Sequence, residues 1–443
     1  MTEHYETSPD QKVTEDRSAV SAVDWFRLDN AAKIYPPARS RYWAPMFRLS
    51  ADLSEEIDTD LLKTALDHTL ARLPSFSCRL RKGFFWYYLE RIEGAPAILP
   101  DVNNPMTYFN AKDNKHFLFR IRCCGNRLAL EFFHAVTDGS GGMTFLLTLI
   151  SEYVRLRYHE TIPTSGHVLS CSDPPKAEEY EDSFLKYARK ETLSRGERPA
   201  YQPQGAEMSP FEVSYIYGNV PTEALLREAR KHNATVGEFV TAVLIQIAAG
   251  LQTAERSRTK RRLPVKVSVP VNLRRFYPTK TLRNFSSYIN LGIETRLGSY
   301  SFDEILVQVK SAMKSQITEK QLNARFSGNV ATERILPLRA TPLFIKDPLL
   351  KLFYNMQGDR YSSLSFSNLG RVDAPEQLQR YVKQLDFALG PANRKRCACT
   401  CVSFAGNTRF VFTRTFEGAQ IEREFFCSLV KRGIPVKVES NRR

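Results

Sequence analysis

The chain has 443 residues, of which 42% are hydrophobic and 25% charged, with 21 glycines, 24 prolines and eight cysteines. This composition is typical of globular proteins and excludes a disordered chain, a collagen-like repeat and a disulfide-stapled scaffold. The length predicts two large domains or about three of ordinary size. The formal net charge of +15 raises the question of an anionic partner.

No leader or membrane segment is predicted. The first 20 residues contain no apolar stretch and carry these acidic residues: Glu3, Glu6, Asp10, Glu15 and Asp16. A signal peptide needs an apolar core, so none is expected there. The longest apolar stretch, residues 239–251, is interrupted by Gln246 and is too short to cross a bilayer. We therefore expect a soluble, cytoplasmic protein without a transmembrane segment.

The two halves of the chain open with the same pattern. Residues 46–53 alternate as a strand does, and residues 60–73 place leucines on one face of a helix. In the second half, residues 211–220 alternate likewise, and helices are predicted over 222–231 and 235–249. Thr235 and Glu238 fit a capping box at the start of the later helix, and Asn233 suits the left-handed position that ends the earlier one. The repeated order predicts an α/β fold with two related lobes.

A polar segment with consecutive prolines at 174 and 175 separates the halves, as is typical of a connection. We predict an N-terminal lobe over residues 1–165, a crossover linker over 166–210 and a C-terminal lobe over 211–443. A further helix is predicted over 141–158. Further strands are predicted over these ranges: 117–123, 127–133, 265–271, 364–368, 398–404 and 408–415.

Cys397, Cys399 and Cys401 alternate along one predicted strand, which places three thiols on one face. Core packing is favoured over a metal or redox role, because no Cys-x-x-Cys pair occurs in the chain.

Two other segments leave alternatives open. The basic run 256–262 is interpreted as a solvated loop. The alternative interpretation is a docking site for a phosphorylated molecule or an acidic carrier protein. No zinc-finger, RNP or leucine-zipper pattern accompanies the run, so we expect no nucleic-acid partner. Residues 336–356 are rich in Leu, Phe and Ile and predict a packed helix with a proline-broken start. Contact with a membrane or a greasy substrate is the alternative.

The stretch from 127 to 143 carries the strongest chemical signal. An apolar strand ends at His134, Asp138 follows four residues later, and Gly139 opens a glycine-rich turn into a helix. An imidazole held at such a position suits a general base, because it titrates near neutral pH. A strand-end histidine satisfied by backbone hydrogen bonds is the plainer alternative. Zinc is not expected, because no third ligand stands at a suggestive spacing.

Residues 133–139, Phe-His-Ala-Val-Thr-Asp-Gly, resemble the active-site motif of the chloramphenicol acetyltransferase-like superfamily. That superfamily includes peptide synthetase condensation domains, BAHD acyltransferases, wax ester synthases and bacterial alcohol acetyltransferases. Residues 270–274, Pro-Val-Asn-Leu-Arg, and the later Asn284 are similar to its second-half arginine segment. Residues 367–370 and 386–390 match more weakly. The alcohol acetyltransferase branch is the nearest fit.

The resemblance implies two α/β sandwich lobes with an active-site tunnel between them. It implies that His134 is the general base for an acceptor hydroxyl that attacks an acyl thioester directly. The thioester, of coenzyme A or of an acyl carrier protein, is then a co-substrate, and no cofactor is implied. No Gly-x-Ser-x-Gly elbow or suggestively spaced cysteine offers a nucleophile for an acyl-enzyme.

The resemblance also implies supporting roles. Asp138 would pair with Arg274 and fix the turn that presents the histidine, whereas two independent surface charges are the alternative. Gly139 would give the backbone room, and Asn284 would support the site. For the oxyanion, the candidates are a backbone N–H near Gly139 and the hydroxyl of Ser367.

Two departures and two rival functions remain. Phe133 stands where condensation domains and chloramphenicol acetyltransferases usually carry a second histidine. Residues 386–390 keep three of the five residues of the BAHD Asp-Phe-Gly-Trp-Gly segment. An amide-forming condensation-type enzyme with an amine acceptor is one rival function. A non-catalytic binding protein of the same fold is the other.

Overall fold

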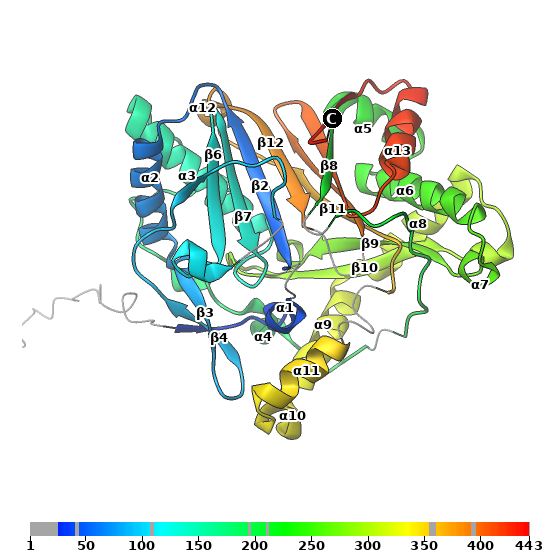
Figure 1. Cartoon of the computed structure of the whole chain (residues 1–443), viewed down its shortest axis with the longest axis horizontal. Helices are drawn as coiled ribbons and strands as arrows, with labels where there is room; N and C mark the ends of the chain where they lie inside the picture. The colour runs from blue at the N-terminus through cyan, green and yellow to red at the C-terminus, as the bar shows by residue number, and fades with distance from the viewer. Residues whose placement is uncertain are drawn as a thin grey trace, which may run out of the picture.

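The computed structural model describes residues 25–39, 44–106, 110–193, 196–209, 212–353, 360–390 and 396–442. The leader prediction concerns residues 1–20 and lies outside this part of the chain. Two α/β lobes lie side by side, each built on one sheet with helices packed against it (Figure 1). The predicted two-lobed α/β fold is confirmed.

The first lobe is a five-stranded sheet in the order β12-β2-β7-β6-β5. Its strands are β2 (Met46–Leu53), β5 (Ile98–Pro100), β6 (Phe119–Cys124), β7 (Arg127–Phe133) and β12 (Val382–Leu389). Helices α2 (Thr59–Arg72) and α3 (Gly139–Tyr158) cover one face (Figure 1). Between them and the sheet, Phe47, Phe132 and Phe145 are fully buried and form the core of this lobe.

The second lobe is a seven-stranded sheet in the order β10-β9-β11-β13-β14-β8-β15. Its strands are β8 (Ser214–Pro221), β9 (Val265–Asn272), β10 (Ser286–Ile293), β11 (Leu364–Arg371), β13 (Cys397–Phe404), β14 (Asn407–Arg414) and β15 (Lys437–Ser440). The helices of this lobe are α5 (Thr222–Lys231), α6 (Val236–Thr253), α7 (Arg258–Arg261), α8 (Phe302–Gln316) and α13 (Gln420–Lys431).

A third, three-stranded sheet contains β1 (Trp25–Arg27), β3 (Cys78–Lys82) and β4 (Tyr87–Arg91). The remaining α-helices are α1 (Tyr35–Ala38), α4 (Ser183–Tyr187), α9 (Glu319–Arg334), α10 (Leu336–Ala340), α11 (Leu343–Phe353) and α12 (Glu376–Gln379). Helices α9 to α11 lie below the two large sheets in the view of Figure 1.

Strand β12 belongs to the second half of the sequence but pairs with β2 of the first-lobe sheet. Its Leu385 and Phe387 are buried in the first core, while Asp386 binds Arg127 of β7 (3.0 Å) and Arg409 of β14 (2.9 Å). The division at residues 165 and 211 stays a prediction, and sheet pairing does not follow it at this strand. Sequence patterning missed β12, because Lys383 and polar neighbours interrupt its alternation.

Local signals read from the sequence hold well in the second lobe. The Thr235–Glu238 capping box opens α6, and Asn233 takes the left-handed conformation (φ 51°) just before it. Cys397, Cys399 and Cys401 are each at most 3% exposed in the core, and burial raises the pKa of all three thiols. The core-packing prediction for these cysteines is confirmed.

Helix α6 is, within the described ranges, the one helix that is long and apolar enough to cross a membrane. It packs against the second-lobe sheet, and most of its apolar side chains lie in that core. A helix buried in this way meets the same length and composition criteria without crossing a bilayer.

Candidate active site

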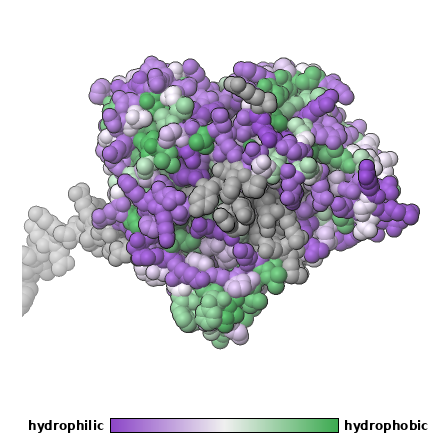
Figure 2. Space-filling view, viewed as in Figure 1, coloured by the Kyte–Doolittle hydropathy of each residue, from purple (hydrophilic) through white to green (hydrophobic). Residues whose placement is uncertain are grey.

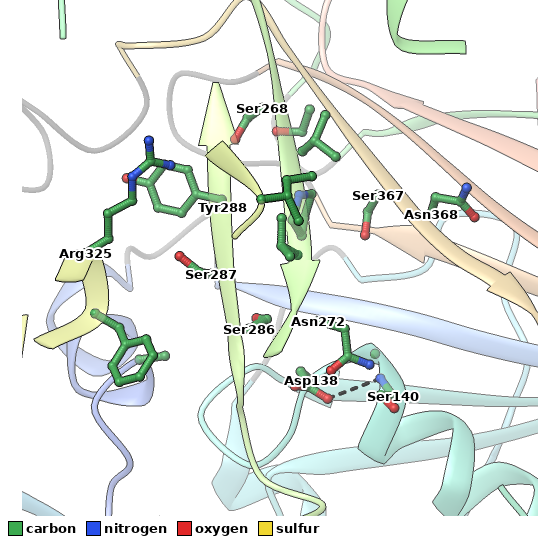
Figure 3. A pocket seen from close by; sticks show the side chains of 18 of the residues that line it. Asp138, Ser140, Ser268, Asn272, Ser286, Ser287, Tyr288, Arg325, Ser367 and Asn368 are labelled. Carbon is green, nitrogen blue, oxygen red and sulfur yellow. Dashed lines mark hydrogen bonds between the residues drawn. The ribbon is translucent and has the colours of Figure 1, made fainter. Parts of the chain in front are cut away.

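A cavity of about 2150 Å³ lies between the lobes. The first lobe lines it with His134, Asp138 and Gly139, and the second lobe with residues such as Ser286 and Ser367. Strands β9, β10 and β11 present a series of polar side chains to it (Figure 3). The sequence analysis expected a tunnel between two lobes, and this cavity occupies that position.

His134 follows the last residue of β7, where the strand ends and the chain turns into α3. Its backbone N–H donates to the carbonyl oxygen of Pro45 (2.9 Å), which fixes the end of the strand. The ring of Tyr35 stacks on the imidazole with 4.8 Å between centroids, and Phe47 meets it edge-on at 5.1 Å. The imidazole is therefore held between aromatic rings in the cavity wall.

Asn284 of the second lobe determines which nitrogen of His134 carries the proton. Its Nδ2 donates to the His134 carbonyl oxygen (2.9 Å) and to Oδ2 of Asp29 (3.1 Å). Its Oδ1 therefore faces Nδ1 of His134 (2.9 Å) and accepts a hydrogen bond from an Nδ1–H group. The lone pair is left on Nε2, which has no hydrogen-bond partner within the described residues. This is the arrangement that a general base requires.

Electrostatics favour the neutral imidazole. Burial lowers the pKa of His134, and the nearby Asp138 charge and the Asn284 hydrogen bond oppose that shift only in part. A neutral ring at physiological pH can accept a proton, whereas a protonated ring could not.

Asp138 joins the two lobes. Its Oδ1 accepts from the backbone N–H groups of Ser140 and Gly141 (both 3.1 Å) and so caps α3, as Figure 3 shows for Ser140. Its Oδ2 accepts from Arg274 Nη1 (2.8 Å) and from the N–H of Phe285 (2.9 Å). Burial would raise the pKa of Asp138, but Arg274 and these N–H donors together lower it. The structure thus places Asp138 and Arg274 in the ion pair that the sequence analysis expected.

The turn after His134 leaves no room for side chains. A Cβ at Gly139 would lie 2.8 Å from Cδ2 of Leu369, a flexible side-chain end. A Cβ at Gly141 would lie 2.0 Å from the carbonyl oxygen of Leu282 and 2.3 Å from Oγ1 of Thr137. The steric requirement is therefore stricter at Gly141, which the sequence analysis did not single out.

Two further side chains at the site carried no recognisable signal in the sequence. Asp29 is fully buried, binds Asn284 and lies 3.6 Å from Arg283. Burial raises the pKa of Asp29 to about 6, while Arg283 opposes the shift. His167 lines the same cavity and hydrogen-bonds Oγ1 of Thr144 (2.9 Å). Both lie in irregular segments, where no periodicity or spacing marks them.

Ser367 lies on β11, is 8% exposed and lines the cavity beside Asn368 (Figure 3). Three further serines, which the sequence did not single out, also line the cavity: Ser268, Ser286 and Ser287. No group of three His, Cys, Asp or Glu side chains suited to a metal ion occurs in the part of the chain that the structure describes.

The second-lobe wall of the cavity also carries positive charge. Arg230 on α5, Arg275 after β9, and Lys310 and Lys314 one turn apart on α8 all line it. None of the four forms an ion pair within the described ranges. This wall can therefore neutralise an anionic ligand.

No family model matches the chain. Two uncharacterised proteins, from two strains of Mycobacterium tuberculosis, are each 24% identical to it over 356 residues, which is 75% of this chain and 80% of theirs.

Solved structures are similar over nearly the whole chain. Polyketide synthase associated protein 5 from Mycobacterium tuberculosis has a TM-score of 0.57 at 15% identity, covering 91% of this chain and 97% of that one. The first condensation domain of the CDA synthetase has a TM-score of 0.57 at 16% identity, covering 92% and 95%. F. graminearum TRI101, complexed with coenzyme A and T-2 mycotoxin, has a TM-score of 0.59 at 11% identity, covering 94% and 99%.

The chain has the chloramphenicol acetyltransferase-like fold. The fold that the resemblance of residues 133–139 implied is therefore confirmed, and the roles that it implied for these residues stay predictions. Within this fold, the cavity described above lies between the two lobes. Phe133, which departs from the paired-histidine pattern, is fully buried in the first-lobe core, and His134 follows it directly at the end of β7.

Proposed function

We propose that the protein transfers an acyl group from a coenzyme A or carrier-protein thioester to an alcohol hydroxyl. Nε2 of His134 takes the hydroxyl proton as the acceptor oxygen attacks the thioester carbonyl. The tetrahedral intermediate then expels the thiolate, which recovers the proton from the imidazolium. One ester C–O bond forms and one C–S bond breaks, so the step needs no cofactor and no acyl-enzyme.

The observation that carries this proposal is the pair of hydrogen bonds between Asn284 and His134, which we call the Asn284 clamp. It presents an unprotonated nitrogen of a neutral imidazole in the wall of a large cavity between the lobes. A histidine that serves only to pack the core does not need an unprotonated nitrogen at the wall of a cavity. Asp138 acts as a positioning residue, because its four hydrogen bonds occupy both oxygens. It fixes the turn, and Arg274 holds it from the other lobe.

Two groups can stabilise the negative oxygen of the intermediate. The backbone N–H of Gly139 stands at the first turn of α3, where helix N–H groups lack intrahelical acceptors. The Ser367 hydroxyl lines the same cavity from β11. We propose them as oxyanion donors, with Gly139 contributing its backbone.

The cationic wall supports a phosphorylated donor. Lys310 and Lys314 can contact the phosphates of coenzyme A or of a carrier's phosphopantetheine arm. In steady-state assays, we expect the paired change Lys310→Glu and Lys314→Glu to raise the KM for acetyl-CoA with little change in kcat. Lys320→Glu on α9 is the control, because Lys320 is exposed and does not line the cavity. Equal KM values for the two variants would overturn this assignment.

The acceptor decides between ester and amide formation. The purified protein is supplied with acetyl-CoA and panels of alcohols or amines, and release of free thiol is followed. Ester formation predicts thiol release with alcohols, whereas release with amines alone would identify the amide-forming, condensation-type rival. We propose an alcohol acceptor and a cytoplasmic location.

The same assay tests the catalytic histidine. We expect His134→Ala to lower kcat by about 10²- to 10⁴-fold, as loss of a general base does. His167→Ala is the matched control, because its ring lines the same cavity but hydrogen-bonds Thr144. If His134→Ala keeps full activity, or if no acceptor releases thiol from the wild type, the binding-protein reading replaces this proposal.

A further inference from the structure

The two short helices α10 and α11 expose an unusual number of large apolar side chains. Together with the loop between β3 and β4, they form what we call the apolar face: Phe84, Phe85, Ile335, Leu336, Phe344, Ile345, Leu349 and Leu352. Each of these side chains is at least 41% exposed, and Leu336 reaches 74%. Figure 2 shows apolar residues gathered on this projection at the lower edge of the molecule.

The orientation of α11 is the reverse of a surface helix. Its charged Lys346 is 2% exposed, donates to the carbonyl oxygen of Phe85 (3.0 Å) and lies 3.5 Å from the Trp86 ring centroid. Asp347 binds Lys82 (2.8 Å) and the Tyr87 hydroxyl (2.7 Å). Lys346 and Asp347 therefore face the protein. Leu343 is buried as well, whereas the apolar side chains of Phe344, Ile345, Leu349 and Leu352 face outward. A helix in water normally does the opposite.

The face is firmly held rather than loosely attached. The N–H of Leu343 donates to the carbonyl oxygen of Phe84 (2.8 Å), which joins α11 to the β3–β4 loop. Together with the Lys346 and Asp347 contacts, this hydrogen bond joins α11 to the β3–β4 hairpin at several points. The outward apolar residues of the two form a single patch.

The exposed charged side chains around the apolar face are basic. Arg334, Arg339 and Lys351 are exposed around the apolar residues. The one acid between residues 334 and 352 is Asp347, which is already bound by Lys82. Apolar side chains surrounded by basic ones are typical of surfaces that bind anionic bilayers.

We propose that the apolar face docks on the surface of a lipid bilayer that contains anionic headgroups. The large side chains enter the interfacial layer, while the three basic residues contact the headgroups. The cavity reaches this end of the molecule, because Trp86, Leu338 and Leu350 line it. Docking would therefore place the cavity beside the membrane. This proposal does not depend on the acyl-transfer proposal.

A second copy of the chain is a poorer occupant of the face. Two copies meeting through it would bring the same basic residues together, and no free acid on the segment compensates them. A bilayer with anionic lipids supplies both an apolar interior and the opposite charge.

The test is sedimentation of the full-length protein with vesicles of phosphatidylcholine alone or mixed with phosphatidylglycerol. We expect sedimentation with the mixed vesicles and much less with the neutral ones. The variant Phe344→Glu with Leu349→Glu should abolish it. The variant Arg339→Glu with Lys351→Glu should weaken partition by about 30-fold or more, because each basic residue near an anionic surface contributes about 1 kcal/mol. Both variants change exposed side chains, and a circular dichroism melt confirms that they fold.

Val430→Glu on α13 is the matched control, because Val430 is 56% exposed and lies outside the face. It should sediment like the wild type. The proposal is overturned if mixed vesicles do not bind the wild type, or if the Phe344 and Leu349 variant binds as well as Val430→Glu. It is also overturned if light scattering shows that the wild type is a dimer, the Phe344→Glu and Leu349→Glu variant is a monomer, and neither binds vesicles.

Discussion

Asn284 and His134 exchange two hydrogen bonds between the lobes: Nδ1 of His134 donates to Oδ1 of Asn284, and Nδ2 of Asn284 donates to the His134 carbonyl oxygen, both at 2.9 Å. A carbonyl oxygen can only accept, so the second bond fixes which end of the amide faces the ring. The second lobe thereby sets the tautomer of a histidine that the first lobe supplies.

Removing this clamp should impair catalysis more than folding. We expect Asn284→Ala to lower kcat by about 10- to 100-fold, because the imidazolium that forms as the acceptor is deprotonated loses its Nδ1–H hydrogen bond. A hydrogen bond to a charged group is worth about 1.5–3 kcal/mol. Thiol-release kinetics measure the change. Asn290→Ala on β10 is the control, because Asn290 binds Glu197, makes no contact with His134 and is not among the residues that line the cavity. Equal losses for the two variants would show that His134 does not depend on the clamp.

The pH profile of activity should report the buried imidazole. Burial lowers the pKa of His134, so its neutral form persists to lower pH than an exposed histidine, whose pKa is about 6.5. The kcat/KM should rise with pH and reach half of its plateau below about pH 6.5. Asp138 raises the His134 pKa, so Asp138→Asn should move this midpoint to lower pH. A midpoint above the ordinary histidine value would contradict the assignment.

The Asp138–Arg274 pair should matter for stability. Asp138→Ala leaves a largely buried guanidinium without its carboxylate, and we expect the free energy of unfolding to fall by about 3–5 kcal/mol in urea titrations. The folded-state pKa of Asp138 is lowered. The contribution is therefore present above the unfolded pKa of about 3.9 and is lost as the pH falls through the lower folded value.

Glu319→Ala is the control for that measurement. Glu319 pairs with Arg189 on the surface, with side chains 44% and 53% exposed. Its loss should change the free energy of unfolding by less than about 1 kcal/mol. Comparable losses at the two sites would mean that burial of Asp138 does not strengthen its role.

The glycine turn gives a second stability test. Gly141→Ala forces a Cβ against the carbonyl oxygen of Leu282 and should cost about 3 kcal/mol, because the backbone of the other lobe must move. Gly250→Ala in α6 meets nothing within 4 Å and should stabilise the helix by about 0.5–1 kcal/mol. Thermal melts of the two variants should therefore shift in opposite directions.

Asp29 should give stability a pH dependence of its own. Its folded pKa of about 6 lies above the unfolded value, so its contribution is complete below about pH 3.9 and is lost as the pH rises through 6. Relative to Asp29→Asn, wild-type stability should rise by about 1–1.5 kcal/mol between about pH 8 and pH 5. Urea titrations at the two pH values measure it.

Local patterns in the sequence predicted most of the helices and strands and the turn at the centre of the site. Strand β7, helix α3 and the cap on α6 follow from alternation, helical spacing and a Thr–Glu pair, which are properties of neighbouring residues. The His134–Asp138 spacing marked the turn for the same reason. Strand β12 was missed because its buried residues face two different sheets and its pattern is mixed.

The sequence by itself therefore determined the order of strands and helices and the turn that carries His134, because alternation, helical spacing and glycine positions are properties of residues close in the chain. The tertiary structure decided the geometry around that turn. Asn284 lies 150 residues after His134, Asp29 meets Asn284 across 255 residues, and the reversed orientation of α11 depends on a loop some 260 residues earlier. Such contacts form when the chain packs, and no local spacing encodes them.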